Sequence, residues 1–82
     1  MKDLYKLSDL KQGEKALVFQ INSKNEIARR FRDIGLINGT EISCIHKSPL
    51  GDPAAYMIRG ALIAIRSEDA DTVLVGNSGI SV

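Results

Sequence analysis

The only strong helix signal in the chain lies in residues 23–35, SKNEIARRFRDIG. Ser23, followed three residues later by Glu26, matches the capping box, in which the serine hydroxyl accepts a hydrogen bond from a free N–H group of the first turn. Apolar residues spaced at i, i+4 and i+7 fall on one helix face, and these are Ile27, Phe31 and Ile34. Gly35 suits the left-handed conformation that ends many helices. We therefore predict a helix of about ten residues that begins after Ser23 and ends at Ile34.

On both sides of this helix, short segments rich in β-branched and aromatic residues predict strands, with chain-breaking residues between them. An extended entry and a single turn come first and end at Gly13. The expected strands cover residues 15–22, 40–47, 55–59, 61–66 and 72–75. Because residues 61–66 are almost continuously apolar, we expect this strand to be central, and we expect a polar turn at 67–71. The pattern predicts a mainly β fold with one short helix, a small and partly open β-barrel.

The chain of 82 residues is long enough for one domain, which we place at residues 1–75, followed by a flexible C-terminal tail at 76–82. The net charge of +1 argues against a nucleic-acid binder, because such proteins usually carry a basic excess. No apolar run approaches the ~20 residues that span a bilayer. The first residues also lack the apolar core of a signal peptide. We therefore expect a cytoplasmic protein.

Ordered motifs extend over residues 4–75, and they consist of Leu7, Leu10, Gly13, Arg30, Phe31, Gly35, Leu36, Gly39, Thr40, residues 49–53 (PLGDP), Gly60, residues 63–66 (IAIR), Ala70 and Val75. In this order and spacing they resemble the FeoA family, small SH3-like proteins of bacterial ferrous-iron uptake. Two positions depart from the family pattern. Asn38 stands where members often have proline, and Ala54 stands where a larger apolar residue is common.

The resemblance implies an SH3-like barrel and a non-enzymatic accessory protein. Its implied partner is the FeoB-type ferrous iron permease, which carries a cytoplasmic G-protein domain. We expect contact with the cytoplasmic part of that permease, modulation of its transport, no cofactor, and attachment to the membrane only through the partner. Weak self-association through open strand edges is a further alternative. The chain has no P-loop motif and no catalytic triad, so catalysis has little support.

Cys44 and His46 suggest an alternative function, a small protein that binds or delivers a transition metal. They lie two residues apart on an expected strand, which would place both side chains on one face. A thiolate and an imidazole are both metal ligands, but only carboxylates such as Glu41 or Asp52 could complete the site. The competing interpretation packs Cys44 beside Ile42 in the core, and metal binding would then be weak or adventitious.

Three arginines of the expected helix, Arg29, Arg30 and Arg32, are candidate partner-binding residues. We expect them to cluster with Lys24, away from the apolar helix face. Such a cluster either faces water or docks onto an acidic partner surface or an anionic membrane rim.

The loop at residues 48–53 supplies two further candidates, Leu50 and Asp52. Its glycine, aspartate and prolines are typical of a turn. In the functional interpretation, Leu50 lies at the tip of this loop and anchors a partner protein.

Overall fold

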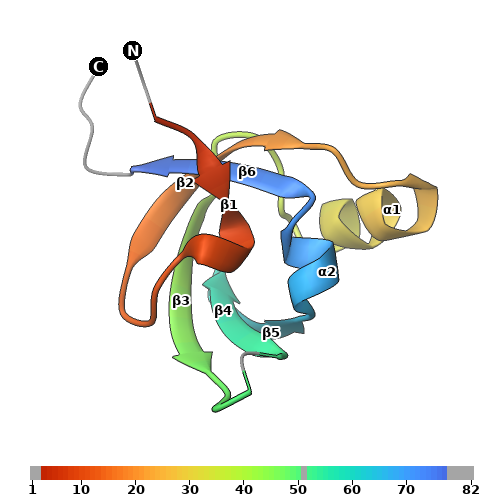
Figure 1. The fold of residues 1–82 in the computed structure, drawn as a ribbon. Helices are drawn as coiled ribbons and strands as arrows, with labels where there is room; N and C mark the ends of the chain where they lie inside the picture. Colours follow the sequence, from red (N-terminus) through yellow and green to blue (C-terminus); the bar gives the residue numbers. More distant parts are fainter. Residues whose placement is uncertain (1–2, 51, 78–82) are drawn as a thin grey trace.

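The computed structural model describes residues 3–50 and 52–77, in which one antiparallel sheet curls around the core (Figure 1). Its strands are β1 (Tyr5–Lys6), β2 (Lys15–Ile21), β3 (Glu41–Lys47), β4 (Ala54–Ile58), β5 (Ala61–Ile65) and β6 (Val73–Asn77), in the spatial order β1-β6-β2-β3-β4-β5. The helical segments are the 3-10 turn η1 (Leu7–Asp9), α1 (Asn25–Asp33) and the single turn α2 (Ser67–Ala70). The prediction of a mainly β fold with one short helix is confirmed, and α2 replaces the expected polar turn.

Alternate strand residues point into the curled sheet and form the core. In β4, Ala54, Tyr56 and Ile58 are buried, while Ala55 and Met57 are only half-buried. This alternation is expected of a strand that has the core on one face only. The other buried apolar side chains are Leu7, Leu10, Ala16, Val18, Phe31, Leu36, Ile42, Cys44, Ile65, Ala70, Val73 and Val75. The helical segments thus complete a core that the sheet mainly supplies.

The N-terminus of α1 differs from the capping-box prediction, because Ser23 does not cap the helix. The N-cap is Lys24, without a side-chain hydrogen bond, and the helix begins one residue later than expected. The Ser23 hydroxyl lies instead 2.5 Å from the Thr72 hydroxyl, with which it shares a hydrogen bond. The neighbouring N–H of Asn22 donates to the Thr72 carbonyl at 2.7 Å. The Ser23 hydroxyl, which the local sequence predicts to cap α1, therefore bonds to the segment just before β6.

At the C-terminus, α1 ends at Asp33, one residue before the predicted end, and Gly35 provides the predicted left-handed stop. Gly35 has φ of +88°, its N–H donates to the Arg32 carbonyl at 3.0 Å, and the N–H of Leu36 donates to the Phe31 carbonyl at 2.8 Å. These two bonds define a Schellman motif, in which a left-handed residue satisfies the last carbonyls of a helix. Phe31 and Leu36 are both buried, which supplies the apolar contact that usually accompanies the motif.

The Gly35 carbonyl joins the end of α1 to the sheet. It accepts hydrogen bonds from the Thr40 hydroxyl at 3.1 Å and from Nε of Arg59 at 3.0 Å. Arg59 lies in the turn between β4 and β5, and its side chain covers Gly35 so closely that a Cβ on Gly35 would lie 2.5 Å from Arg59 Cδ. The positively charged guanidinium also suits the negative end of the helix dipole.

We predict that Gly35→Ala lowers the free energy of unfolding more than Gly39→Ala, measured by urea denaturation. Both glycines have φ near +90°, which costs an alanine about 1–2 kcal/mol. Only at Gly35 does the added methyl group meet Arg59, whose displaced hydrogen bond is worth about 1 kcal/mol more. In an Arg59→Ala background this difference should disappear, and equal losses in the native background would contradict the packing of Arg59 on Gly35.

The position of one strand and the end of another differ from the predictions. β5 is not central, because β4 is its only neighbour among the described strands and it therefore forms an edge of the sheet. Ala61, Leu62 and Ala64 are exposed, so its continuous apolar run reflects small or solvent-facing side chains and not burial on both faces. β6 extends to Asn77, two residues into the expected tail, and residues 78–82 lie outside the described part. Within that part no helix is long and apolar enough to cross a membrane.

Candidate binding groove

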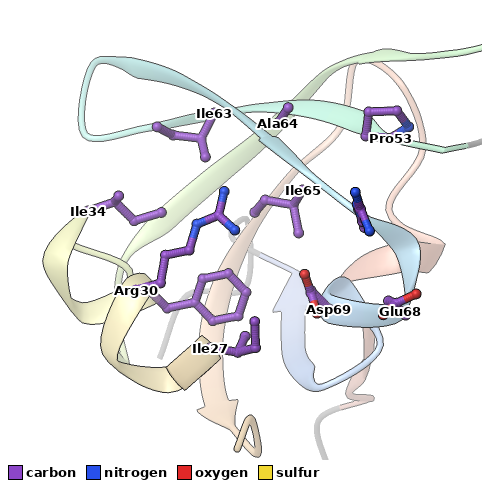
Figure 2. Close-up of a pocket in the computed structure, with 11 residues that line it drawn as sticks. Ile27, Arg30, Ile34, Pro53, Ile63, Ala64, Ile65, Glu68 and Asp69 are labelled. Atoms are coloured by element: carbon purple, nitrogen blue, oxygen red, sulfur yellow. The ribbon is translucent and has the colours of Figure 1, made fainter. Parts of the chain in front are cut away.

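A groove of about 460 Å³ lies between α1, β5 and α2 (Figure 2). Most of its apolar lining comes from two elements far apart in the sequence, the core-facing side of α1 and the edge strand β5, and Pro53 adds to it from the loop before β4. The apolar residues are Ile27, Phe31, Ile34, Pro53, Ile63, Ala64 and Ile65. Volumes of this size are typical of binding pockets, in which apolar walls are combined with a few polar groups.

Four charged side chains surround this apolar lining: Arg30 from α1, and Arg66, Glu68 and Asp69 at α2. Figure 2 shows Arg30 extending from α1 into the groove, with Glu68 and Asp69 across from it on α2. Within residues 3–50 and 52–77, none of the four side chains forms an ion pair or a hydrogen bond. The groove therefore combines an apolar floor with charges of both signs that are available to a partner.

The helix geometry points the three arginines, which were expected to cluster, in different directions. Residues two apart on an α-helix point about 160° away from each other. Arg30 accordingly lines the groove, whereas Arg32 borders a second cavity of about 440 Å³, together with Ile21 and Ile37, on the other flank of α1. Arg29 is exposed and lines neither cavity. Of the three candidates, only Arg30 is placed beside the groove.

The loop before β4 adjoins the α2 side of the groove. Its Asp52 carboxylate accepts a hydrogen bond of 2.8 Å from the Ser67 N–H, at the first residue of α2, while Pro53 lines the groove. Leu50 is 94% exposed, as expected for a residue at a loop tip. Asp52 thus joins the residues just before β4 to α2, and the exposed Leu50 side chain is available for contact with another molecule.

We predict that Leu50→Ala changes the free energy of unfolding by less than about 0.5 kcal/mol, because the side chain contributes almost nothing to the core. The matched change Leu10→Ala, at a fully buried leucine, should cost about 2–5 kcal/mol. Thermal or urea denaturation of both variants tests this. A comparable loss at Leu50 would mean that the leucine packs against the domain.

The structure separates Cys44 from His46, so the prediction that they share a strand face is wrong. A register shift between them in the β3–β4 ladder changes the alternation, and Ile45 and His46 are both exposed. Cys44 is buried in the same core cluster as Ile42, as the competing interpretation expected. Burial is the main cause that raises the pKa of its thiol, which disfavours the metal-binding thiolate. In the described part of the chain, no three His, Cys, Asp or Glu side chains are grouped to hold a metal ion.

We predict that Cys44 reacts with a thiol-specific reagent at pH 8 at least about a hundredfold more slowly in the folded protein than in urea, since the reagent must wait for the chain to open. Addition of cobalt(II) should neither slow this reaction further nor produce a thiolate-to-metal absorption band. Rapid reaction in the folded state, with protection by cobalt, would support the metal-binding alternative.

Local sequence patterns do not mark several of the groove residues as partner-binding, namely Ile63, Ile65, Arg66, Glu68 and Asp69. The reason is that they line a groove only because β5 lies at the sheet edge beside α1. No local pattern reports that placement. The charged residues after β5 were the available signal, since charges beside an apolar strand can mark the rim of a binding surface.

Comparison with known proteins identifies the family. The FeoA domain profile matches residues 5–77, nearly the whole described part of the chain. The chain belongs to the FeoA family. It is 29% identical over 70 residues to the Fe(2+) transport protein A/Fe(2+) transporter FeoB fusion protein of Porphyromonas gingivalis, a match that covers 85% of this chain and only 8% of that much longer protein.

Solved FeoA structures share the fold. The solution structure of FeoA from Chlorobium tepidum is 32% identical, with a TM-score of 0.86, over 90% of this chain and 70% of that one. The crystal structure of Stenotrophomonas maltophilia FeoA, complexed with zinc and described as a prokaryotic SH3 domain protein, is 30% identical, with a TM-score of 0.76, over 85% and 87% of the two chains. The expected resemblance to FeoA proteins and the SH3-like fold are confirmed.

Proposed function

We propose that this FeoA-family protein is a non-enzymatic accessory protein of Fe²⁺ uptake that binds the cytoplasmic part of a FeoB-type permease. The observation that carries the proposal is the Porphyromonas gingivalis relative, in which a FeoA part and a FeoB transporter belong to one chain. Covalent linkage keeps two partners at high effective concentration, so it is consistent with a working contact between the separate proteins. In this proposal the protein acts in the cytoplasm and meets the membrane only through the permease.

The groove between α1, β5 and α2 is the contact surface that this proposal favours. Partner surfaces typically combine an apolar centre with a charged rim, and the groove has both within one recess. Leu50, exposed on the adjoining loop, adds an apolar contact next to it. The Arg30 guanidinium has no carboxylate partner within the described residues and would attract an acidic side chain of the permease.

Modulation by such a contact needs no chemistry in the accessory protein itself. A partner shifts a two-state equilibrium only by the difference in its affinity for the two states. A tenfold preference for one permease conformation corresponds to about 1.4 kcal/mol. In the proposed mechanism, the FeoA-family protein binds one conformation of the permease more tightly and raises its population.

The experiment that tests this proposal is a calorimetric titration of the protein against the cytoplasmic part of the cognate permease. It is repeated with guanine nucleotide and with ferrous iron. Saturable binding whose affinity depends on the nucleotide supports the proposal and names the conformation that is preferred. Absence of binding both to this part and to the intact permease in detergent would overturn it.

We predict that Arg30→Glu weakens binding to the permease by at least about tenfold, because it replaces a charge-assisted contact by repulsion. Arg29→Glu makes the same charge change on the same helix, outside the groove, and should weaken binding by less than about threefold through long-range attraction alone. Titration of the two variants at a fixed salt concentration measures the difference. If the two variants weaken binding equally, the contact does not depend on the groove position of Arg30.

A further inference from the structure

The edge strand β5 presents unpaired backbone groups to the outside. Within residues 3–50 and 52–77 it pairs only with β4, through a turn of two residues, Arg59 and Gly60, both with positive φ. In such a hairpin the residues on either side of the turn, Ile58 and Ala61, form a hydrogen-bonded pair.

Hydrogen-bonded and non-hydrogen-bonded pairs then alternate along the antiparallel ladder. The register places Ile63 opposite Tyr56 and Ile65 opposite Ala54, so Ile63 and Ile65 direct their N–H and C=O groups toward β4. Leu62 and Ala64, between them, direct theirs away from β4. In the described part of the chain, neither residue forms a backbone hydrogen bond outside the β4–β5 ladder.

This free edge forms one wall of the groove. Ile63, Ala64 and Ile65 are consecutive and all three line it, together with Arg66. Successive side chains of a strand point to opposite faces, so consecutive residues share a groove only if it runs along the edge of the strand. The Ala64 side chain is too small to cover its own peptide groups. Figure 2 shows Ile63, Ala64 and Ile65 along the side of the groove that faces α1.

β5 also lacks the features that protect most strand edges. Its sequence, Ala-Leu-Ile-Ala-Ile, contains no charge and no proline, and its pairing with β4 shows no bulge. Leu62 is 60% exposed on the outer face. An apolar edge of this kind is a template for an added strand.

We propose that the β5 edge binds an extended segment of the permease by strand addition, pairing with the free peptide groups of Leu62 and Ala64. Alternate apolar side chains of that segment would lie over Ile63 and Ile65 in the groove. An acidic side chain would face Arg30, whose charge has no described partner. This inference rests on the proposed function, and it names the contact surface and the conformation of the bound segment.

A second copy of this chain suits the same edge less well. The antiparallel register that pairs the free groups of Leu62 in one copy with those of Ala64 in the other also sets Gly60 opposite Arg66. The Arg66 of each copy would then lie next to the Arg59 of the other, and like charges across a strand pair are unfavourable. A segment without a basic residue at this position avoids that repulsion.

Amide hydrogen exchange, followed residue by residue by NMR, tests the proposal on the unaltered protein. Without partner, the Leu62 and Ala64 amides should exchange rapidly, while Ile63 and Ile65, bonded to β4, serve as protected internal controls. In the presence of a saturating concentration of the cytoplasmic part of the permease, exchange of the Leu62 and Ala64 amides should slow at least about tenfold.

Three other results would overturn the proposal, and they are distinguishable. Saturable binding with unchanged exchange at Leu62 and Ala64 rejects strand addition but leaves the proposed function intact. Absence of binding rejects the proposed function as well. If, without partner, protection of the Leu62 and Ala64 amides increases with protein concentration, the β5 edge binds a second copy of the chain instead.

A pair of variants at Ala64 provides an independent check. Ala64→Pro removes an outward N–H that β4 does not use, and proline is tolerated at such edge positions. Ala64→Val retains the N–H. We expect the proline variant to bind the cytoplasmic part of the permease at least about tenfold more weakly, and the valine variant within about threefold of the native chain. Equal affinities would overturn strand addition, and the exchange measurement decides the matter even where the proline variant does not fold.

Discussion

The hydrogen bonds on the Gly35 carbonyl hold the helix at the position on which the groove depends. Thr40 donates to this oxygen from the position just before β3, and Arg59 donates from the turn that leads into β5. At the other end of α1, the hydroxyl pair of Ser23 and Thr72 joins the chain to the segment before β6. Because α1 is fixed at both ends, the space between it and β5 has a defined width. That space is the groove.

The groove brings three kinds of interaction together on one surface. The apolar side of α1 contributes burial, which supplies affinity without direction. The β5 edge contributes free peptide groups, which in the proposed strand addition would fix the direction and register of the bound segment. The charges of Arg30, Arg66, Glu68 and Asp69 contribute selection between partners and faster association. In the proposed function, these three contributions together would let the domain recognise one segment of the permease.

Local sequence patterns predicted most of the secondary structure, because they depend on neighbours in the chain. The apolar face of α1 and the left-handed Gly35 follow from spacing and backbone freedom, and both are confirmed. The patterns failed where distant residues compete for the same group. Thr72 takes the hydroxyl of Ser23, and the register shift in β3 turns His46 away from the side of Cys44. The edge position of β5 depends on the order of strands in the whole sheet. Its apolar sequence therefore led to the wrong prediction of a central strand, and the groove beside it was not predicted.

The strand order has a consequence for the synthesis of the protein. β6 is the last of the described strands in the chain, yet it lies between β1 and β2, and Tyr5 pairs with Val75. A ribosome adds about 5–20 residues per second, so β1 and β2 emerge well before the strand that joins them. Closing the long loop between β2 and β6 has an entropy cost, which is offset only by the interactions of the completed sheet. The domain therefore folds late, and a nascent chain halted before Val73 leaves the β6-facing edges of β1 and β2 open to aggregation.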